Sequence, residues 1–406
     1  MPDIHLLPPR DQDTEDTAAD TGNERKKDYR SKIRSHRFTL FYKAALVILL
    51  AAGIVLIVWI QWKNKLYSVC AITSSVKTDA FQDNSLVDFD GDVLSYGKDG
   101  ACCVSHKGKT LWNITYEMQD PMVRTNGSMA AIGDFDGQKI YVMDKNGTAG
   151  EISTTMPIYK FCIAQNGVVA AVLNDTSVTW IYVYDSSGNK LAYFKTTMRQ
   201  SGYPVDVAIS PNGILVGVSY LHADAGALKT SIAFYNFGGV GQNETDNYVS
   251  GYDYSDTLAP DIDFLDSKTA YAAMAGRLVF YTGGQKPVSA AEHIENSEIQ
   301  SVYSGDGYVV MVFNSSTGDN RYRMDIYNKA GTLLRSKDFN IDYTDIKIKG
   351  DLVYVYNETE CLIYNVNGIV KFSGNLGRSA KLIIPSGDVR KMQLVTDSSI
   401  DEAELK

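Results

Sequence analysis

The chain has 406 residues, of which 44% are hydrophobic and 21% are charged, so most of it is expected to bury a core of ordinary size. Its formal net charge is −9, and residues 66–406 carry 40 acidic against 28 basic side chains. An acidic domain repels nucleic-acid phosphates, which excludes nucleic acid as an expected partner. The five cysteines and five histidines form neither a disulfide framework nor the spacing of a zinc site, and no cofactor is expected.

The first 37 residues are polar and unevenly charged. They contain three prolines, an acidic stretch at 11–20 and a basic stretch at 25–37. Few apolar side chains offer little burial to offset the conformational entropy of the chain. We therefore predict a disordered tail over residues 1–37.

A transmembrane helix is predicted over residues 38–61. No charged residue occurs from Ala44 to Ile60, and the apolar stretch reaches the roughly 20 residues that span a bilayer. Eight basic residues precede this segment and two follow it, which places the N-terminus in the cytoplasm and the C-terminal domain outside the cell. A cleaved signal peptide is the alternative, but the long leading segment and the lack of a small-residue cleavage pattern after Trp59 argue against it. Residues 62–75 are expected to form a short stalk.

The remaining chain is periodic. A short strand, a turn and a second strand recur seven times, with turn glycines at 108, 147, 188, 239, 283, 331 and 368, spaced by 37 to 51 residues. Glycine suits such hairpins because their turns and bulges require positive φ. An apolar strand, usually led by Gly, such as GVVAAVL at 167–173, precedes each hairpin in the same phase.

Seven such pairs predict an all-β fold, a β-propeller over residues 76–406 with four strands in each blade. Seven blades are expected, or eight if the two ends of the domain together form a whole additional blade. A β-sandwich would not repeat the same strand-and-hairpin pair seven times at a regular spacing, and a solenoid would leave its two ends open. The apolar strands are expected next to the central axis. The segment 381–405 is expected to close the ring by pairing with strands near residues 76–97.

The segment GDVLSYGKDGACCVSHKGKTLW, at 91–112, resembles the repeat of quinoprotein-type propellers. The whole layout, down to the final KLIIP and LVTDSSIDEAELK stretches, resembles an uncharacterised family of bacterial single-pass membrane proteins with an extracellular propeller. This resemblance implies the fold and the anchor, and it implies no activity and no site residues.

Two patterns that carry chemistry elsewhere have simpler explanations here. Asp88, Asp90 and Asp92 alternate as in a calcium loop, but the glycine falls at the wrong position and no closing glutamate follows, so a hairpin turn is favoured. Cys102 and Cys103 are adjacent, as in the vicinal disulfide of quinone-dependent propeller enzymes. They lie in a predicted strand, where successive side chains face opposite sides.

The long insertions in blades four to six are the strongest candidates for a binding face, because loops that extend a rigid scaffold often bind partners. We predict a binding loop that contains the following residues: Tyr248, Tyr252, Asp253, Tyr254 and Asp256.

No catalytic constellation is recognisable in the sequence. We therefore predict a membrane-anchored, non-catalytic binding or scaffold module whose partner is an envelope protein or a glycan. An extracellular hydrolase with carboxylates at the propeller axis is the alternative. A third alternative is a sensor that signals through the helix, but the short N-terminal tail contains no recognisable output domain.

Overall fold

The computed structural model describes residues 16–175, 178–197, 201–224, 226–315 and 320–406. The chain divides into two compact units, one ending at Lys65 and the other running from Leu66 to Lys406.

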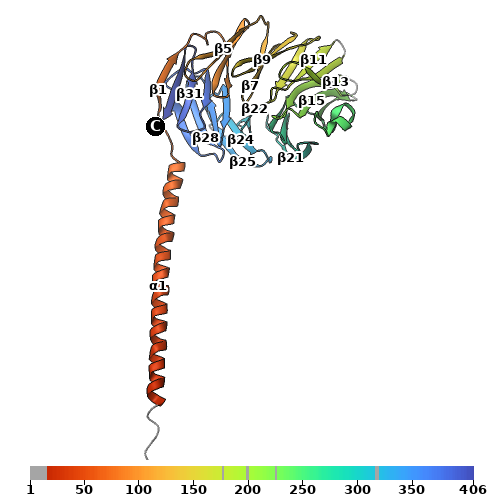
Figure 1. Cartoon of the computed structure of the whole chain (residues 1–406). Helices are drawn as coiled ribbons and strands as arrows, with labels where there is room; N and C mark the ends of the chain where they lie inside the picture. The colour runs from red at the N-terminus through yellow and green to blue at the C-terminus, as the bar shows by residue number, and fades with distance from the viewer. Residues whose placement is uncertain (1–15, 176–177, 198–200, 225, 316–319) are drawn as a thin grey trace, which may run out of the picture. The chain divides into compact units, whose positions relative to one another are not determined.

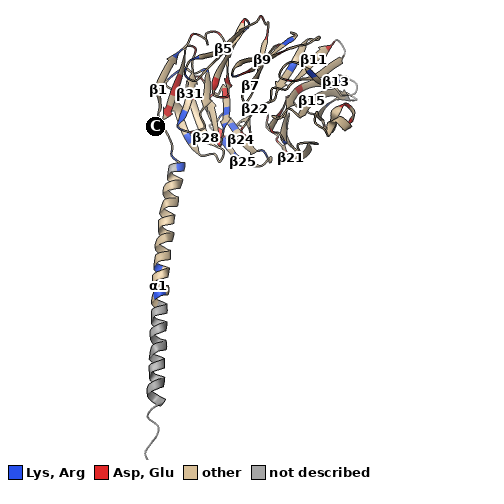
Figure 2. Ribbon diagram, in the orientation of Figure 1, with Lys and Arg blue, Asp and Glu red and all other residues tan. Residues whose placement is uncertain are grey.

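The first unit contains one helix, α1 (Asp16–Lys63). Residues His36–Gln61 of this helix have a mean hydropathy of 2.7 and the length to cross a bilayer, and Figure 2 shows a long tan stretch of α1 without Lys, Arg, Asp or Glu. Residues 16–37, which belong to the predicted disordered tail, form part of α1, and residues 1–15 lie outside the described part of the chain. The basic stretch is rich in Arg and Lys, which favour helix, and extending an existing helix needs no new nucleation.

The second unit consists of eight antiparallel sheets of four strands each (Figure 1). We number them as blades 1 to 8. Blade 1 contains β2 (Ser85–Phe89), β3 (Asp92–Tyr96), β4 (Gly100–Val104) and β5 (Thr110–Thr115). Blade 2 contains β6 (Pro121–Asn126), β7 (Met129–Asp134), β8 (Lys139–Asp144) and β9 (Gly147–Ser153). Blade 3 contains β10 (Ile158–Ile163), β11 (Val169–Asp175), β12 (Val178–Tyr184) and β13 (Lys190–Thr197). Blade 4 contains β14 (Tyr203–Ile209), β15 (Leu215–Asp224), β16 (Ala227–Asn236) and β17 (Tyr248–Ser255), with the 3₁₀ turns η1 (Gly241–Asn243) and η2 (Thr245–Asn247) before β17.

Blade 5 contains β18 (Asp261–Asp266), β19 (Thr269–Met274), β20 (Arg277–Thr282) and β21 (Val288–Ile294). Blade 6 contains β22 (Ile299–Gly305), β23 (Tyr308–Asn314), β24 (Tyr322–Asn328) and β25 (Leu333–Phe339). Blade 7 contains β26 (Asp345–Lys349), β27 (Leu352–Tyr356), β28 (Glu360–Asn365) and β29 (Val370–Asn375). Blade 8 contains β30 (Leu382–Pro385), β31 (Lys391–Val395), β32 (Ser399–Leu405) and β1 (Cys70–Lys77).

The first strand of each blade lies at the axis of the ring. Neighbouring first strands contact each other in an unbroken circle, from β2 through β6, β10, β14, β18, β22 and β26 to β30, which contacts β2 again. The apolar strands predicted to lie at the axis are instead the second strands. They are buried along their length, as in β19 and β27, because both of their faces pack against neighbouring blades.

Hydrophobic clusters between blades hold the ring together. Eight clusters of buried side chains occupy the eight blade interfaces. The cluster between blades 1 and 2, for example, joins Leu94 and Trp112 to Ile132. A single blade has no apolar interior of its own, so the sheets become stable only by stacking, as in other repeat folds.

The recurring hairpin joins the third and fourth strands of each of blades 1 to 7. The pairing of these two strands shifts register beside the turn in all seven blades, as a β-bulge does. Six of the seven predicted turn glycines have positive φ, among them Gly108 at 76° and Gly368 at 78°. Gly239 is not among the positive-φ glycines. In its blade the longer connection through η1 and η2 places Asp246 and Asn247 at positive φ instead.

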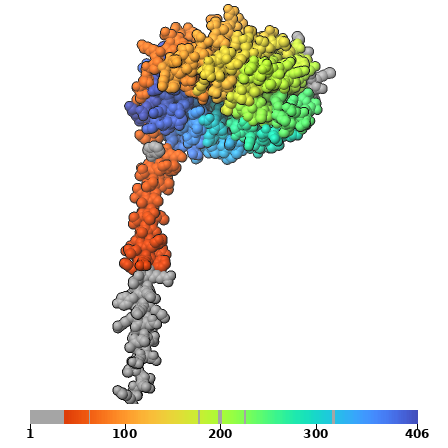
Figure 3. Space-filling view, viewed as in Figure 1, coloured from red at the N-terminus to blue at the C-terminus, as the bar shows by residue number. Residues whose placement is uncertain are grey.

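The ring closes through strands from both ends of the domain, as predicted, but the C-terminal segment pairs with β1 at 70–77 and not with the strands near 76–97 that were expected. The ring has eight blades and not the favoured seven. The order in blade 8 is β1-β32-β31-β30, so the first strand of the propeller pairs with the last. In Figure 1 the orange strand β1 lies beside the blue C-terminal strands, and in Figure 3 orange and blue atoms adjoin at the same side of the propeller. The propeller therefore begins at Leu66, and residues 70–75 belong to β1 and not to a stalk.

Candidate functional site

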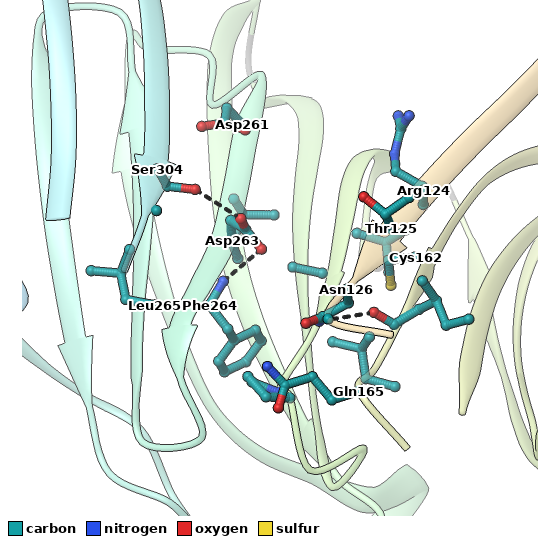
Figure 4. A pocket seen from close by; sticks show the side chains of 18 of the residues that line it. Arg124, Thr125, Asn126, Cys162, Gln165, Asp261, Asp263, Phe264, Leu265 and Ser304 are labelled. Atoms are coloured by element: carbon teal, nitrogen blue, oxygen red, sulfur yellow. Dashed lines mark hydrogen bonds between the residues drawn. The ribbon is translucent and has the colours of Figure 1, made fainter. Parts of the chain in front are cut away.

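A large pocket lies at the ring axis. It has a volume of about 890 Å³ and is lined mainly by the first strands of blades 1 to 6 and by the turns that follow them. Figure 4 shows Asp261 and Asp263 on one wall, with Arg124 and Cys162 opposite. A volume of this size accommodates a small organic ligand.

Strand alternation explains why charged side chains reach the pocket. Asp261 and Asp263 are two residues apart in β18 and therefore face the same side, whereas the intervening Ile262 is buried in the interface between blades 4 and 5. Lys160 and Cys162 follow the same rule in β10. The first strands carry polar residues on the axis side because that side borders the pocket.

An ion pair joins three blades across one wall of the pocket. Lys160 Nζ lies 2.8 Å from Asp206 Oδ1 and 3.1 Å from the carbonyl oxygen of Val205. The backbone N–H of Ile262 donates to the other oxygen of Asp206 at 3.0 Å. Both side chains of the pair are mostly buried, so the contact fixes blades 3, 4 and 5 relative to one another.

The Asp263 carboxyl is also held by the protein. It accepts hydrogen bonds from the backbone N–H of Phe264 at 2.8 Å and from Ser304 Oγ at 3.0 Å. Burial raises the pKa of Asp263 to about 6, against the lowering effect of these two hydrogen bonds. Asp263 is therefore largely ionised at neutral pH.

Asp261 differs from its neighbours. Burial, followed by the negative charges of Asp206 and Asp263, raises the pKa of Asp261 to about 7. Its Oδ2 atom is inaccessible to water and has no hydrogen-bond partner among the described residues. A carboxyl with these properties at the wall of a pocket is a candidate for ligand binding or for acid–base chemistry.

The predicted binding loop is not a loop. Tyr248, Tyr252, Asp253 and Tyr254 lie in β17, the outermost strand of blade 4, and Asp256 follows directly at a φ of 55°. The alternation of Tyr252 and Tyr254 with Asp253 in this segment is the period of a strand, which the density of Gly, Asp and Asn in the surrounding sequence obscured.

Most of these β17 side chains serve the fold. Tyr252 donates to the carbonyl oxygen of Pro287 at 3.0 Å, and the hydroxyls of Tyr254 and Tyr281 lie 2.8 Å apart, so both rings brace blade 4 against blade 5. Asp253 pairs with Lys229 at 3.1 Å.

A second, smaller pocket brings three of the five predicted residues together. It has a volume of about 540 Å³ and lies between blades 3 and 4, where Tyr248, Tyr252 and Asp253 line it together with Lys195. Tyr248 is 47% exposed there. Tyr254 and Asp256 do not line this pocket. We call it the peripheral groove.

The other candidate motifs resolve into structural roles. Asp90, at a φ of 53°, and Gly91 form the turn between β2 and β3, and Gly91 N–H donates to Asp88 at 2.9 Å. Among the described residues, no group of three or more His, Cys, Asp or Glu side chains is arranged to hold a metal ion. Cys102 and Cys103 are free thiols in β4, and burial raises the pKa of Cys103 to about 12, which makes it a poor nucleophile.

The sequence reading missed the residues of the axial pocket. A weak signal was present, because one or more charged residues interrupt each of three short apolar segments that precede the Gly- or Thr-led strands: IYKFCI at 158–163, YPVDVAI at 203–209 and DIDFLD at 261–266. Only the third segment has charges at two alternate positions, Asp261 and Asp263, which is the pattern of a strand face that meets water or a ligand.

The fold and the axial pocket together define an eight-bladed β-propeller protein that carries one N-terminal apolar helix. Residues 63–405 match the family of unknown function DUF5711, and the chain belongs to this family. This result confirms the resemblance to an uncharacterised family of anchored propellers.

Two solved structures are similar in fold. BamB from Moraxella catarrhalis is 15% identical, with a TM-score of 0.49 over 83% of this chain and 100% of its own. Hsv2 from Kluyveromyces lactis is 10% identical, with a TM-score of 0.42 over 72% of this chain and 98% of its own. At such identities the likeness concerns the fold alone. No curated protein sequence matches significantly.

Proposed function

We propose that this protein is a membrane-anchored, non-catalytic binding protein that holds a ligand in the axial pocket of its propeller. The observation that carries the proposal is the pocket itself, a cavity of about 890 Å³ whose wall combines several charged groups with fixed positions. Ligand sites are commonly concave, largely pre-formed and furnished with a few well-placed polar groups.

Preorganisation supports a binding role. Asp206 and Asp263 are each held by two hydrogen bonds from the protein, so little side-chain entropy remains to be lost when a ligand binds. The first strands that carry these residues are locked between neighbouring blades, which keeps the wall rigid.

The anchor supports a place at the membrane. The apolar part of α1 is long enough to span a bilayer, and the excess of basic residues before it favours a cytoplasmic N-terminus with the propeller outside the cell. In this arrangement the partner is a component of the cell envelope, a protein or a glycan. The peripheral groove with Tyr248, Tyr252 and Asp253 offers a second surface for it.

A hydrolase is the second candidate function, and one observation favours it. A carboxyl whose pKa is raised to about 7, as in Asp261, can act as a general acid or base near neutral pH. Its neighbour Asp263 would supply the second carboxylate of a pair.

The proposal predicts that a ligand stabilises the propeller through the axial pocket. The full chain in lipid nanodiscs is screened by thermal unfolding against monosaccharides, amino sugars, amino acids and short peptides. A ligand at 100 times its Kd should add about 2.7 kcal/mol to the free energy of unfolding. The control is Gln165→Trp, which places a bulky ring in the pocket at an exposed lining position and should abolish the effect.

Three results decide between the candidates. Stabilisation of the wild type but not of Gln165→Trp supports binding in the axial pocket. Equal stabilisation of both variants, or none of either, contradicts it. Chemical conversion of the ligand by the wild type, lost in Asp261→Asn, would replace the binding role by the hydrolase.

A further inference from the structure

We propose that the axial pocket recognises a primary ammonium group, with the Asp261 carboxylate as its main acceptor. This inference rests on the proposed function, because it assumes that the pocket is a ligand site. The ammonium belongs either to a free amine or to a lysine side chain of a protein partner. The two sources share the same chemistry, and the test below separates them.

The charges that line the pocket favour a cation. Six carboxylates line it, against three basic side chains, namely Asp88, Asp90, Asp206, Asp261, Asp263 and Asp306 against Arg124, Lys160 and Lys349. A cavity with excess charge of one sign concentrates ligands of the opposite sign. An anionic ligand would meet this excess unfavourably, and a neutral polyol would leave it uncompensated.

Of the three neighbouring carboxyls Asp206, Asp261 and Asp263, only Asp261 has a buried oxygen without a hydrogen-bond partner among the described residues. Both oxygens of Asp206 accept hydrogen bonds, from Lys160 and from the backbone N–H of Ile262. Both oxygens of Asp263 do so as well. The Oδ2 atom of Asp261 has no such partner among the described residues, although a buried carboxylate is costly unless it is paired. Because this oxygen is inaccessible in the structure, the proposal requires the side chain to turn toward the pocket when a donor binds.

Lys160 shows how this wall accepts an ammonium group. Its Nζ donates to Asp206 Oδ1 at 2.8 Å and to the carbonyl oxygen of Val205 at 3.1 Å. A ligand ammonium between Asp261 and Asp263 would repeat this arrangement one strand further around the ring. An ammonium has three donors and no acceptor, so it fits a cluster of carboxylate oxygens better than a hydroxyl does.

Binding should depend on pH with a defined sign. The charged and titratable groups that act on Asp261 are Asp206, Asp263, Tyr271 and Lys160. Because the pKa of Asp261 is raised to about 7, this carboxyl is mostly protonated at pH 6 and mostly ionised at pH 8. A cation prefers the ionised form. Its affinity should therefore rise about tenfold from pH 6 to pH 8, and binding near pH 7 should release a proton.

The test uses the full chain in nanodiscs and isothermal titration calorimetry with three probes. They are n-pentylamine, the neutral 1-pentanol, and lysine blocked at both backbone ends. At pH 8, at least one of the two amines should bind at least about tenfold more tightly than the alcohol. Tighter binding of n-pentylamine indicates a free amine as the natural ligand, and tighter binding of blocked lysine indicates a protein partner.

Asp261→Asn should weaken amine binding at least about tenfold and remove its pH dependence. This substitution preserves shape, and near-ultraviolet circular dichroism checks that the variant folds. The matched control is Asp342→Asn, which removes the same charge from an exposed ion pair with Arg321 and should bind like the wild type.

Equal binding of the alcohol, unchanged binding by Asp261→Asn, or affinity that falls as the pH rises would overturn the inference. If no amine binds but another compound stabilises the wild type and not Gln165→Trp, the pocket remains a ligand site and the ammonium specificity alone is wrong. If no compound binds at all, both proposals fall.

Discussion

Removal of residues 399–406 is expected to abolish cooperative folding of the propeller. This truncation deletes β32, which pairs with β31 on one side and with β1 on the other. It opens the ring and leaves two unpaired strand edges, which invite aggregation. It also removes Ile400 from the cluster between blades 8 and 1, and Ala403 and Leu405 from the cluster between blades 7 and 8.

Thermal unfolding followed by circular dichroism, together with limited proteolysis, measures the effect. The truncated chain should show no sharp transition and rapid cleavage throughout residues 66–398. Deletion of residues 2–9, also eight residues but outside the propeller, is the control and should unfold like the wild type. A truncated chain that still unfolds sharply would show that β32 is dispensable for closure.

Phe372→Ala is expected to lower the free energy of unfolding by about 3–5 kcal/mol. Phe372 in β29 has no exposed surface and packs in the cluster between blades 7 and 8 with Tyr354 and Leu394. Its backbone also pairs with Tyr67, just before the closing strand. Loss of the phenyl group of Phe372 leaves a cavity between blades 7 and 8. Packed sheets relax only partly into such a cavity, so most of the cost remains.

Urea unfolding of the two variants in parallel measures this cost. The matched control is Phe135→Ala, because Phe135 is 36% exposed and should cost less than about 1 kcal/mol. A loss for Phe372→Ala no larger than that of the control would contradict the tight packing of blades 7 and 8.

The repeat made the architecture predictable from the sequence. Strands β11 and β27 fall where the apolar segments at 167–173 and 351–357 predicted them, because a strand buried on both faces leaves a continuous apolar run. The number of blades was harder to predict from the sequence. Blade 8 takes β1 from one end of the domain and three strands from the other, so the seven-fold series of glycine hairpins does not include it.

The axial pocket was harder to predict because its parts are distant in sequence. Lys160, Asp206 and Asp261 come from three blades, and only the stacking of these blades brings them together. The first strand of each of these blades carries only one or two of the pocket's charged residues, and such a short pattern is too weak to recognise in a single repeat. Burial and the nearby carboxylates of Asp206 and Asp263 raise the pKa of Asp261, and both effects arise only in the assembled propeller and in no single repeat.

Closure of the ring by β1 and β32 fixes the axis of the propeller and the pocket around it. Ser74 and Glu402 are exposed partners in this pair, so Ser74→Cys with Glu402→Cys places two thiols opposite each other. After mild oxidation, mass spectrometry of the digested protein should find a disulfide between the peptides that contain positions 74 and 402. The pair Ser74→Cys with Glu292→Cys, on different blades, should give none. Equal cross-linking of both pairs, or none of the first, would contradict the closed eight-bladed propeller.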